Sequence, residues 1–161
     1  MTHLDQTDLR ILALLSKNAR MSNKELAHGI SLSPSSTHER LKRLQESDIL
    51  IGTHAEVRLE QLGFALKALL FVQLSEHEKG NLAIFLKEIA KIPEVRAAWM
   101  ISGRFDTLVE LITRDTEHLH RIVVERFSSR PEISRIETSI VFESISKRDL
   151  TDALDLAAPE A

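Results

Sequence analysis

The chain has 161 residues, of which 43% are hydrophobic and 28% are charged, and its formal net charge is −3. This composition is too apolar for a disordered protein, and the length allows one large or two small domains, each with a core. The absence of cysteine excludes disulfide bonds and thiolate metal sites. No apolar run approaches the roughly 18 residues that span a bilayer, and the first ten residues lack a signal-peptide pattern. We therefore expect a cytoplasmic protein without a membrane partner.

The amino-terminal residues carry three closely spaced helix-start signals. Asp5 and Asp8 form a capping-box-like pair at the first start, and Ser22 and Glu25 form a capping box at the second. The third start follows a short turn. Together the signals predict a compact three-helix unit.

The turn between the second and third helices is typical of a helix-turn-helix. Gly29 can adopt the positive φ that lets a helix stop, after which Ser33 caps the next helix and Pro34 occupies its first position. A motif of this kind places its second helix in the major groove of DNA. The alternative is an ordinary amphipathic helix with a solvated polar face.

The polar residues of the helix that follows Ser33 are the candidates for contact with DNA. Whole-chain charge argues weakly against nucleic acid, but residues 1–60 contain eight Lys/Arg against eight Asp/Glu, and three cations lie within four positions of this helix. We expect Glu39 to pair with Arg43 four residues later, and Arg43 to anchor the phosphate backbone. The predicted DNA-contacting residues are Ser33, Ser35, Ser36, His38, Glu39, Arg40, Lys42 and Arg43.

The rest of the chain alternates between strand and helix patterns. Pro93 and Pro131 occupy equivalent junctions, each followed by glutamate, which indicates a duplicated β-α-β unit and a ferredoxin-like arrangement. The predicted domains are a helix-turn-helix domain with a linker strand at residues 1–60, a ligand-binding and oligomerisation domain at residues 61–146, and a helical or frayed tail at 147–161. The expected strands are 67–74, 95–102, 107–113 and a long 133–145, and the expected helices are 82–92 and 119–127.

Residues 4–52, LDQTDLRILALLSKNARMSNKELAHGISLSPSSTHERLKRLQESDILIG, closely resemble the amino-terminal domain of the Lrp/AsnC transcriptional regulators, and the Gly103–Asp106 segment resembles that family's α/β signature. The resemblance covers about residues 4–145. It implies an α+β protein with a winged helix-turn-helix followed by a βαββαβ domain. It also implies a sequence-specific regulator of double-stranded DNA, with homodimers that assemble to tetramers or octamers and a small effector, often an amino acid, bound between dimers. One departure is Asp48, where the family usually has glycine.

The segment 103–107 is the candidate effector site. A glycine-bearing loop at a strand end offers backbone N–H groups to a carboxylate, and Asp106 could receive an ammonium group. The alternative is a β-turn in which Asp106 caps its own backbone. The predicted effector-binding residues are Gly103, Arg104, Phe105, Asp106 and Thr107, with Thr138 and Ser139 as further polar walls or cross-strand pairs.

Three other features have simpler interpretations. His118 and His120 point in different directions on a helix and are expected at the surface or an interface, so we expect no metal site and no cofactor. Trp99 is expected in the core or a dimer interface. The long last strand would expose an apolar edge, which favours a symmetric dimer.

Two other function classes remain open at this point. A sirohaem decarboxylase resembles the same family, and His118, His120, Arg121 and Arg126 could surround a tetrapyrrole, but the sequence has no recognisable catalytic motif, so we expect no enzyme. The other class is an architectural protein that compacts DNA without an effector.

Overall fold

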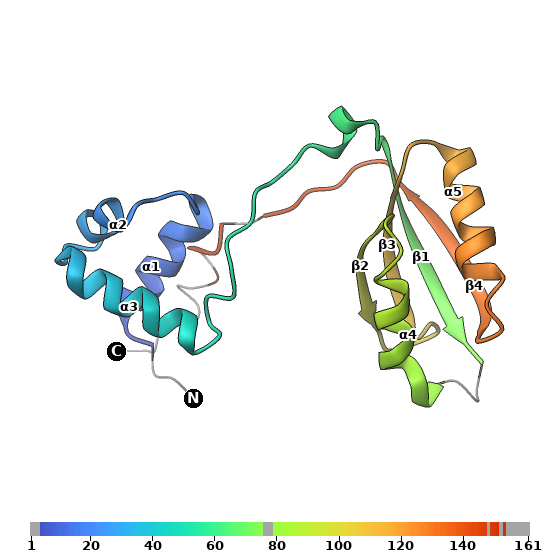
Figure 1. Cartoon of the computed structure of the whole chain (residues 1–161), viewed down its shortest axis with the longest axis horizontal. Coiled ribbons are helices and arrows are strands. Elements are labelled where there is room, and N and C mark those ends of the chain that lie inside the picture. Colours follow the sequence, from blue (N-terminus) through green and yellow to red (C-terminus); the bar gives the residue numbers. More distant parts are fainter. Residues whose placement is uncertain (1–3, 76–78, 148, 152, 154–161) are drawn as a thin grey trace. The chain divides into compact units, whose positions relative to one another are not determined.

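The computed structural model describes residues 4–75, 79–147, 149–151 and 153 (Figure 1). The chain divides into two compact units, Met1–Glu56 with Ile145–Ala161, and Val57–Ser144. The carboxy-terminal segment thus groups with the first unit. No helix in the described part of the chain is long and apolar enough to cross a membrane.

The first unit is built from α1 (Gln6–Lys17), α2 (Asn23–Gly29) and α3 (Pro34–Glu46). Each helix begins at its predicted cap, because a side-chain oxygen there accepts a backbone N–H group that the first helical turn leaves open. The accepting residues are Asp5, Ser22 and Ser33. The three helices enclose an apolar core formed by Ile11, Leu15, Leu26, Ile30 and Leu44.

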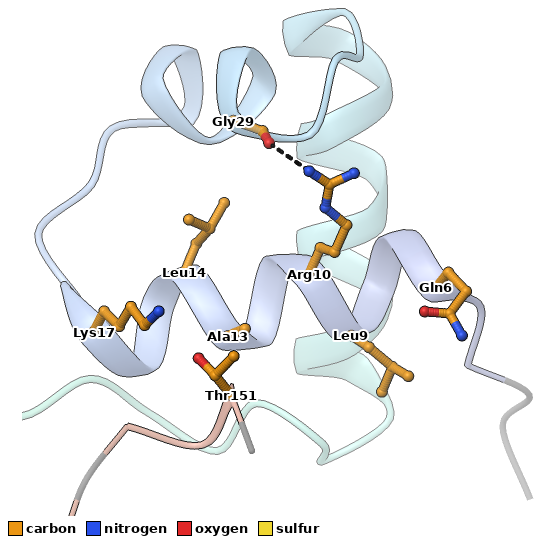
Figure 2. Close-up of a pocket in the computed structure, with 8 residues that line it drawn as sticks. All are labelled: Gln6, Leu9, Arg10, Ala13, Leu14, Lys17, Gly29 and Thr151. Carbon is orange, nitrogen blue, oxygen red and sulfur yellow. Dashed lines mark hydrogen bonds between the residues drawn. The ribbon is translucent and has the colours of Figure 1, made fainter. Parts of the chain in front are cut away.

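Gly29 does not have the predicted role. It ends α2 without a positive φ, and Ser31 adopts the left-handed conformation instead, with φ 58°. A Cβ atom on Gly29 would lie 2.9 Å from Cδ1 of Leu14. Figure 2 shows Gly29 facing α1, where its carbonyl oxygen accepts a hydrogen bond of 3.5 Å from Nη2 of Arg10. The position therefore favours a small residue because α2 approaches α1 closely, and not because the chain turns there.

The residues after α3 complete the first unit. Asp48 has φ 55°, so this aspartate adopts the left-handed conformation for which the resembling family usually has glycine. Residues 51–58 contain no helix or strand, so the linker strand predicted at the end of the first domain is absent there. A short 3₁₀ helix, η1 (Leu59–Leu62), follows, and Gly63 ends it with φ 86°.

The second unit contains four antiparallel strands: β1 (Leu66–Leu74), β2 (Val95–Met100), β3 (Thr107–Thr113) and β4 (Ile133–Val141). Their order in the sheet is β2-β3-β1-β4. The connections are η2 (Lys79–Asn81), α4 (Leu82–Ile89), α5 (Thr116–Ile122) and a π-helical turn, η3 (Val123–Ser128). This is the predicted ferredoxin-like βαββαβ arrangement.

The helices cover one face of the sheet. Alternate residues of β1 and β3 point into this layer, where Leu70, Val72 and Val109 are fully buried with Phe127. On the opposite face, Leu69 and Phe71 of β1 are only partly buried. We call this opposite side the open face; it contains Lys67, Leu69, Phe71 and Gln73 of β1 with their lateral neighbours.

Three predictions for the second unit need correction. The last strand ends at Val141 and not at residue 145, because Val141 pairs with Lys67 near the start of β1 and the chain beyond has no strand beside it. The predicted helix 119–127 is an α-helix that continues as the π-helical turn. His118 is not a surface residue, since its side chain is only 8% exposed, whereas His120 is exposed.

The described part of the predicted tail contacts α1. The backbone N–H of Leu150 donates to Oγ of Ser16 over 3.1 Å, and Oδ2 of Asp149 lies 3.6 Å from Nζ of Lys17. Thr151 borders a cavity of about 210 Å³ beside α1 (Figure 2). Most of the predicted helical or frayed tail, including residues 154–161, lies outside the described residues.

Candidate DNA-binding helix and effector site

The start of α3 is fixed by a cluster of hydroxyl groups. Oγ of Ser33 accepts the backbone N–H of Ser36 over 3.2 Å and lies 2.9 Å from Oγ of Ser35. Thr37 is fully buried and donates its hydroxyl to the carbonyl oxygen of Ser33 over 3.0 Å. Nδ2 of Asn23 on α2 donates to the carbonyl oxygen of Pro34 over 2.7 Å. The amino-terminal end of α3 is therefore held by its own cap and by α2.

The outer face of α3 carries several of the predicted DNA-contacting side chains. Thr37 and Leu44 are buried on the inner face, while Ser35, His38 and Lys42 are exposed on the other side. Nζ of Lys42 lies 3.7 Å from a carboxylate oxygen of Glu46. Both side chains are exposed, so this ion pair holds the lysine only weakly. The outer face can thus offer hydroxyl, imidazole and ammonium groups to a ligand.

Arg40 and Arg43 are bound within the unit. Nη1 of Arg40 lies 2.6 Å from Oδ2 of Asp5 and 2.8 Å from Oδ1 of Asp8. Nη2 of Arg43 lies 2.6 Å from Oδ2 of Asp8, whose side chain is fully buried. The predicted pair between Glu39 and Arg43 is therefore wrong, because the buried carboxylate of Asp8 is the stronger partner. We call these four charged residues, Asp5, Asp8, Arg40 and Arg43, the ion cluster.

The same contacts set the charge states in the ion cluster. The backbone N–H of Asp8, assisted by the guanidinium of Arg40, lowers the pKa of the Asp5 carboxyl group against the opposing effect of partial burial. The carboxylates of Asp5 and Asp8 raise the pKa of Arg40 further above its ordinary value. Both carboxylates also lie at the start of α1, where negative charge is favoured by the helix dipole.

The candidate effector segment forms the turn between β2 and β3. Gly103 has φ 119°, a conformation that other residues rarely adopt, and Phe105 packs on Phe71 with ring centroids 5.6 Å apart. The side chain of Asp106 binds a neighbouring strand: its Oδ2 accepts the backbone N–H of Leu74 on β1 over 2.8 Å. Thr107 is fully buried, and its hydroxyl has no hydrogen-bond partner among the described residues.

The β4 residues near this segment lie on two different faces. Ser139 pairs with Leu69 and shares the open face, whereas Thr138 pairs with the buried Leu70 and points toward the helix layer. The two predicted polar walls therefore do not face one pocket. Sequence reasoning missed Glu137, whose Oε1 lies 3.1 Å from Nη2 of Arg104. The signal for Glu137 was its place two residues before Ser139, because residues two apart on a strand lie on the same face.

Both units match known sequence families. Residues 4–51 match a winged helix-turn-helix DNA-binding domain, and residues 67–151 match the Lrp/AsnC ligand-binding domain. The second match alone covers more than half of the chain. This protein belongs to the Lrp/AsnC family. As a member, it is a DNA-binding transcriptional regulator with a ligand-binding domain.

Individual relatives agree with this assignment. The Lrp/AsnC protein is 32% identical to the HTH-type transcriptional regulator AldR of Mycolicibacterium smegmatis over 142 residues, which are 88% of this chain and 83% of the relative. It is 35% identical to the proline dehydrogenase transcriptional activator of Rhizobium radiobacter over 144 residues, 89% of this chain and 92% of the relative. A transcriptional regulator of Neisseria meningitidis, solved as its complex with L-Met, superposes with a TM-score of 0.82 at 27% identity, over 90% of this chain and 94% of that chain.

Proposed function

We propose that this Lrp/AsnC protein reads operator DNA with α3 and that a free amino acid, bound at the second unit, changes its affinity for DNA. The observation that supports the first part is the exposed outer face of α3, which follows a capped turn and carries Ser35, His38 and Lys42. Hydroxyl and imidazole groups can bind base edges, and an ammonium group binds phosphate.

We assign the DNA-facing surface of α3 to the predicted residues other than Arg40 and Arg43. Ser33 and Ser36 at the helix start can also bind phosphate through hydroxyl and backbone groups, as helix amino termini commonly do. Glu39, on the same exposed side, is not held by Arg43 and is available to accept a hydrogen bond from a cytosine amino group. Arg40 and Arg43 are bound to carboxylates in the ion cluster.

The effector part of the proposal is supported by polar groups around the β2–β3 turn. Arg104, whose side chain is 61% exposed, could bind the carboxylate of a free amino acid, and Glu137 or Asp106 could bind its ammonium group. The unpartnered hydroxyl of Thr107 lies in the same segment. The Neisseria meningitidis relative, solved with L-Met, makes methionine the first amino acid to test.

We further propose that two chains pair through the open face of the sheet and that dimers assemble into tetramers or octamers with the effector between them. A two-fold dimer would present two α3 helices to half-sites about 34 Å apart, or a multiple of that distance. This spacing explains why a regulator of this kind would need a second copy to bind its operator.

One selection experiment tests DNA reading and effector response together. The protein is used to select fragments from random duplex DNA, with and without a pool of the twenty amino acids. The proposal predicts an enriched two-half-site sequence whose affinity changes about 5- to 150-fold with one amino acid. Recovery of fragments without a common sequence, with no response to any amino acid, would instead favour an architectural DNA protein.

The effector site is tested by calorimetry with L-Met and the other amino acids. Arg104→Ala should abolish the heat of binding, while Arg121→Ala, an exposed arginine on α5, should leave it unchanged. Equal binding by both variants would remove the 103–107 segment from the effector site. A sirohaem decarboxylase has no support among the relatives, which are regulators; an absorbance titration with a tetrapyrrole would reveal one.

A further inference from the structure

The ion cluster joins the recognition helix to the first helix across a long stretch of sequence. Arg40 and Arg43 lie one turn apart on α3, and Asp5 and Asp8 lie at the cap and first turn of α1. Two positive and two negative charges meet there, so the cluster carries no net charge. The guanidinium groups of both arginines are thus already neutralised before DNA approaches.

Geometry and burial make this cluster a fixed contact. The Asp8 side chain is fully buried and both of its oxygens are used: Oδ1 faces Arg40 at 2.8 Å, and Oδ2 faces Arg43 at 2.6 Å and the backbone N–H of Asp5 at 3.2 Å. Removal of such partners from a buried carboxylate strongly destabilises the folded protein. Neither arginine can therefore leave Asp8 freely to reach a phosphate. Arg40 is also mostly covered, with 26% of its side chain exposed.

We propose that Arg40 and Arg43 are positioning residues, which fix the orientation of α3 on α1 through Asp8 and thereby set sequence discrimination, while Lys42 supplies the phosphate contact of this segment. The cluster holds the middle and the end of α3, and the bond from Asn23 to the Pro34 carbonyl holds its start. Base-edge hydrogen bonds require side chains placed within about 0.5 Å, so a helix held at three points can discriminate where a loosely held helix cannot.

This inference rests on the proposed docking of α3 in the major groove, and the experiment separates the two ideas. Arg43→Gln and Lys42→Gln each remove one positive charge from neighbouring positions of α3. Arg43→Gln leaves Asp8 its contacts with Arg40 and with the backbone N–H of Asp5, and Lys42 is 67% exposed, so both variants should fold. The selected operator and a non-specific duplex are titrated with each full-length variant over a range of salt concentrations.

The two variants should behave differently. Lys42→Gln should weaken binding to both duplexes and reduce the slope of log K against log salt by about 0.9, the value for one lost phosphate contact. Arg43→Gln should leave the slope on non-specific DNA unchanged and reduce the ratio of operator to non-specific affinity by about tenfold or more, the cost of misreading one base pair.

Asp8→Asn gives a second measurement. It releases both guanidinium groups from their shared carboxylate, so affinity for non-specific DNA should rise and its salt slope should steepen, while operator discrimination falls. Loss of folding stability alone would not produce a gain of this kind. If Asp8→Asn does not fold, the comparison of Arg43→Gln with Lys42→Gln still decides the matter.

Two results would overturn the positioning role. One is a reduced salt slope for Arg43→Gln that equals that of Lys42→Gln, which would make Arg43 a phosphate contact. The other is parental operator discrimination in Arg43→Gln, whatever Lys42→Gln does. If Lys42→Gln is without effect while Arg43→Gln loses discrimination, the positioning role stands and the proposed placement of Lys42 against phosphate fails.

Discussion

Gly29 illustrates how one residue can be required for a reason that local sequence does not reveal. A glycine at the end of a helix suggests a left-handed cap, yet the left-handed residue is Ser31. The requirement at Gly29 is space, because Leu14 of the neighbouring helix occupies the position where a side chain would project. Only the packing of α1 against α2 shows this.

Substitution of Gly29 should depend on the size of the new side chain. Gly29→Ala should change the free energy of unfolding by less than about 1 kcal/mol, because the end of Leu14 can rotate away and alanine favours helix. Gly29→Val should lower it by about 1–3 kcal/mol through overpacking. Urea unfolding followed by circular dichroism measures both. Gly80→Val, where a Cβ atom meets nothing within 4 Å, is the control, and an unchanged midpoint for Gly29→Val would contradict the packing role.

The Asp5 carboxylate predicts a pH dependence of stability. Because its pKa is lower in the folded protein than in the unfolded chain, its contribution to stability is present above the unfolded pKa of about 4 and is lost as the pH falls through the folded value. Asp5→Asn keeps a capping side chain and removes the charge. Its midpoint of thermal unfolding should therefore fall less than that of the parent between about pH 5 and pH 3. Identical pH profiles for the two proteins would contradict this assignment.

At the scale of helices and strands, sequence predicted most of the fold because its signals are local. Capping residues set the starts of α1, α2 and α3, and a dense apolar segment of strand length indicated β1. Strand ends were less predictable, since β4 ends opposite the start of β1 and not where its own apolar pattern ends. The ion cluster was missed for the same reason: Asp8 and Arg43 lie 35 residues apart, and no local pattern pairs them.

His118 shows how a polar side chain can join elements inside the second unit. Its Nδ1 accepts the backbone N–H of Arg114 over 3.3 Å, so Nε2 carries the hydrogen and donates to Oε1 of Glu94 over 3.2 Å. Helix α5 is thereby joined to the residue that precedes β2. The sequence predicted His118 at the surface or an interface, whereas its buried ring has a structural role within the second unit.

Loss of this ring should destabilise the second unit. His118→Ala should lower the free energy of unfolding by about 1–3 kcal/mol, because it leaves a cavity and a largely buried Glu94 carboxylate without this donor. His120→Ala, two residues away and exposed, should change it by less than about 0.5 kcal/mol. Denaturant titration compares the two, and equal stabilities would exclude the proposed bond as a stabilising contact.

At the scale of the whole molecule, the open face of the sheet is the side of the second unit that its own helices leave uncovered. Helices shield the centre of the other face, with Ala68, Leu70 and Val72 fully buried, while Phe71 on the open side is only partly buried and packs on Phe105. Trp99 on the edge strand β2 pairs with Leu108 and is 44% exposed. Of its two predicted locations, the core is therefore wrong, and the dimer interface stays a prediction. Interface cores are enriched in aromatic residues, and the open face carries Phe71 and Trp99.

Trp99→Glu should therefore convert the proposed dimer into a monomer. A carboxylate at this position would have to be desolvated in the interface, which is costly without a partner charge, whereas in a single chain it would face water and leave the fold intact. Analytical ultracentrifugation should show the molar mass falling to that of one chain. Ile84→Glu, at a residue 62% exposed on the outer side of α4, places the same charge on the helix layer and should keep the dimer. A charge weakens the dimer only where the partner chain covers it. If Ile84→Glu dissociates the dimer and Trp99→Glu does not, the interface is therefore on the helix layer and not on the open face.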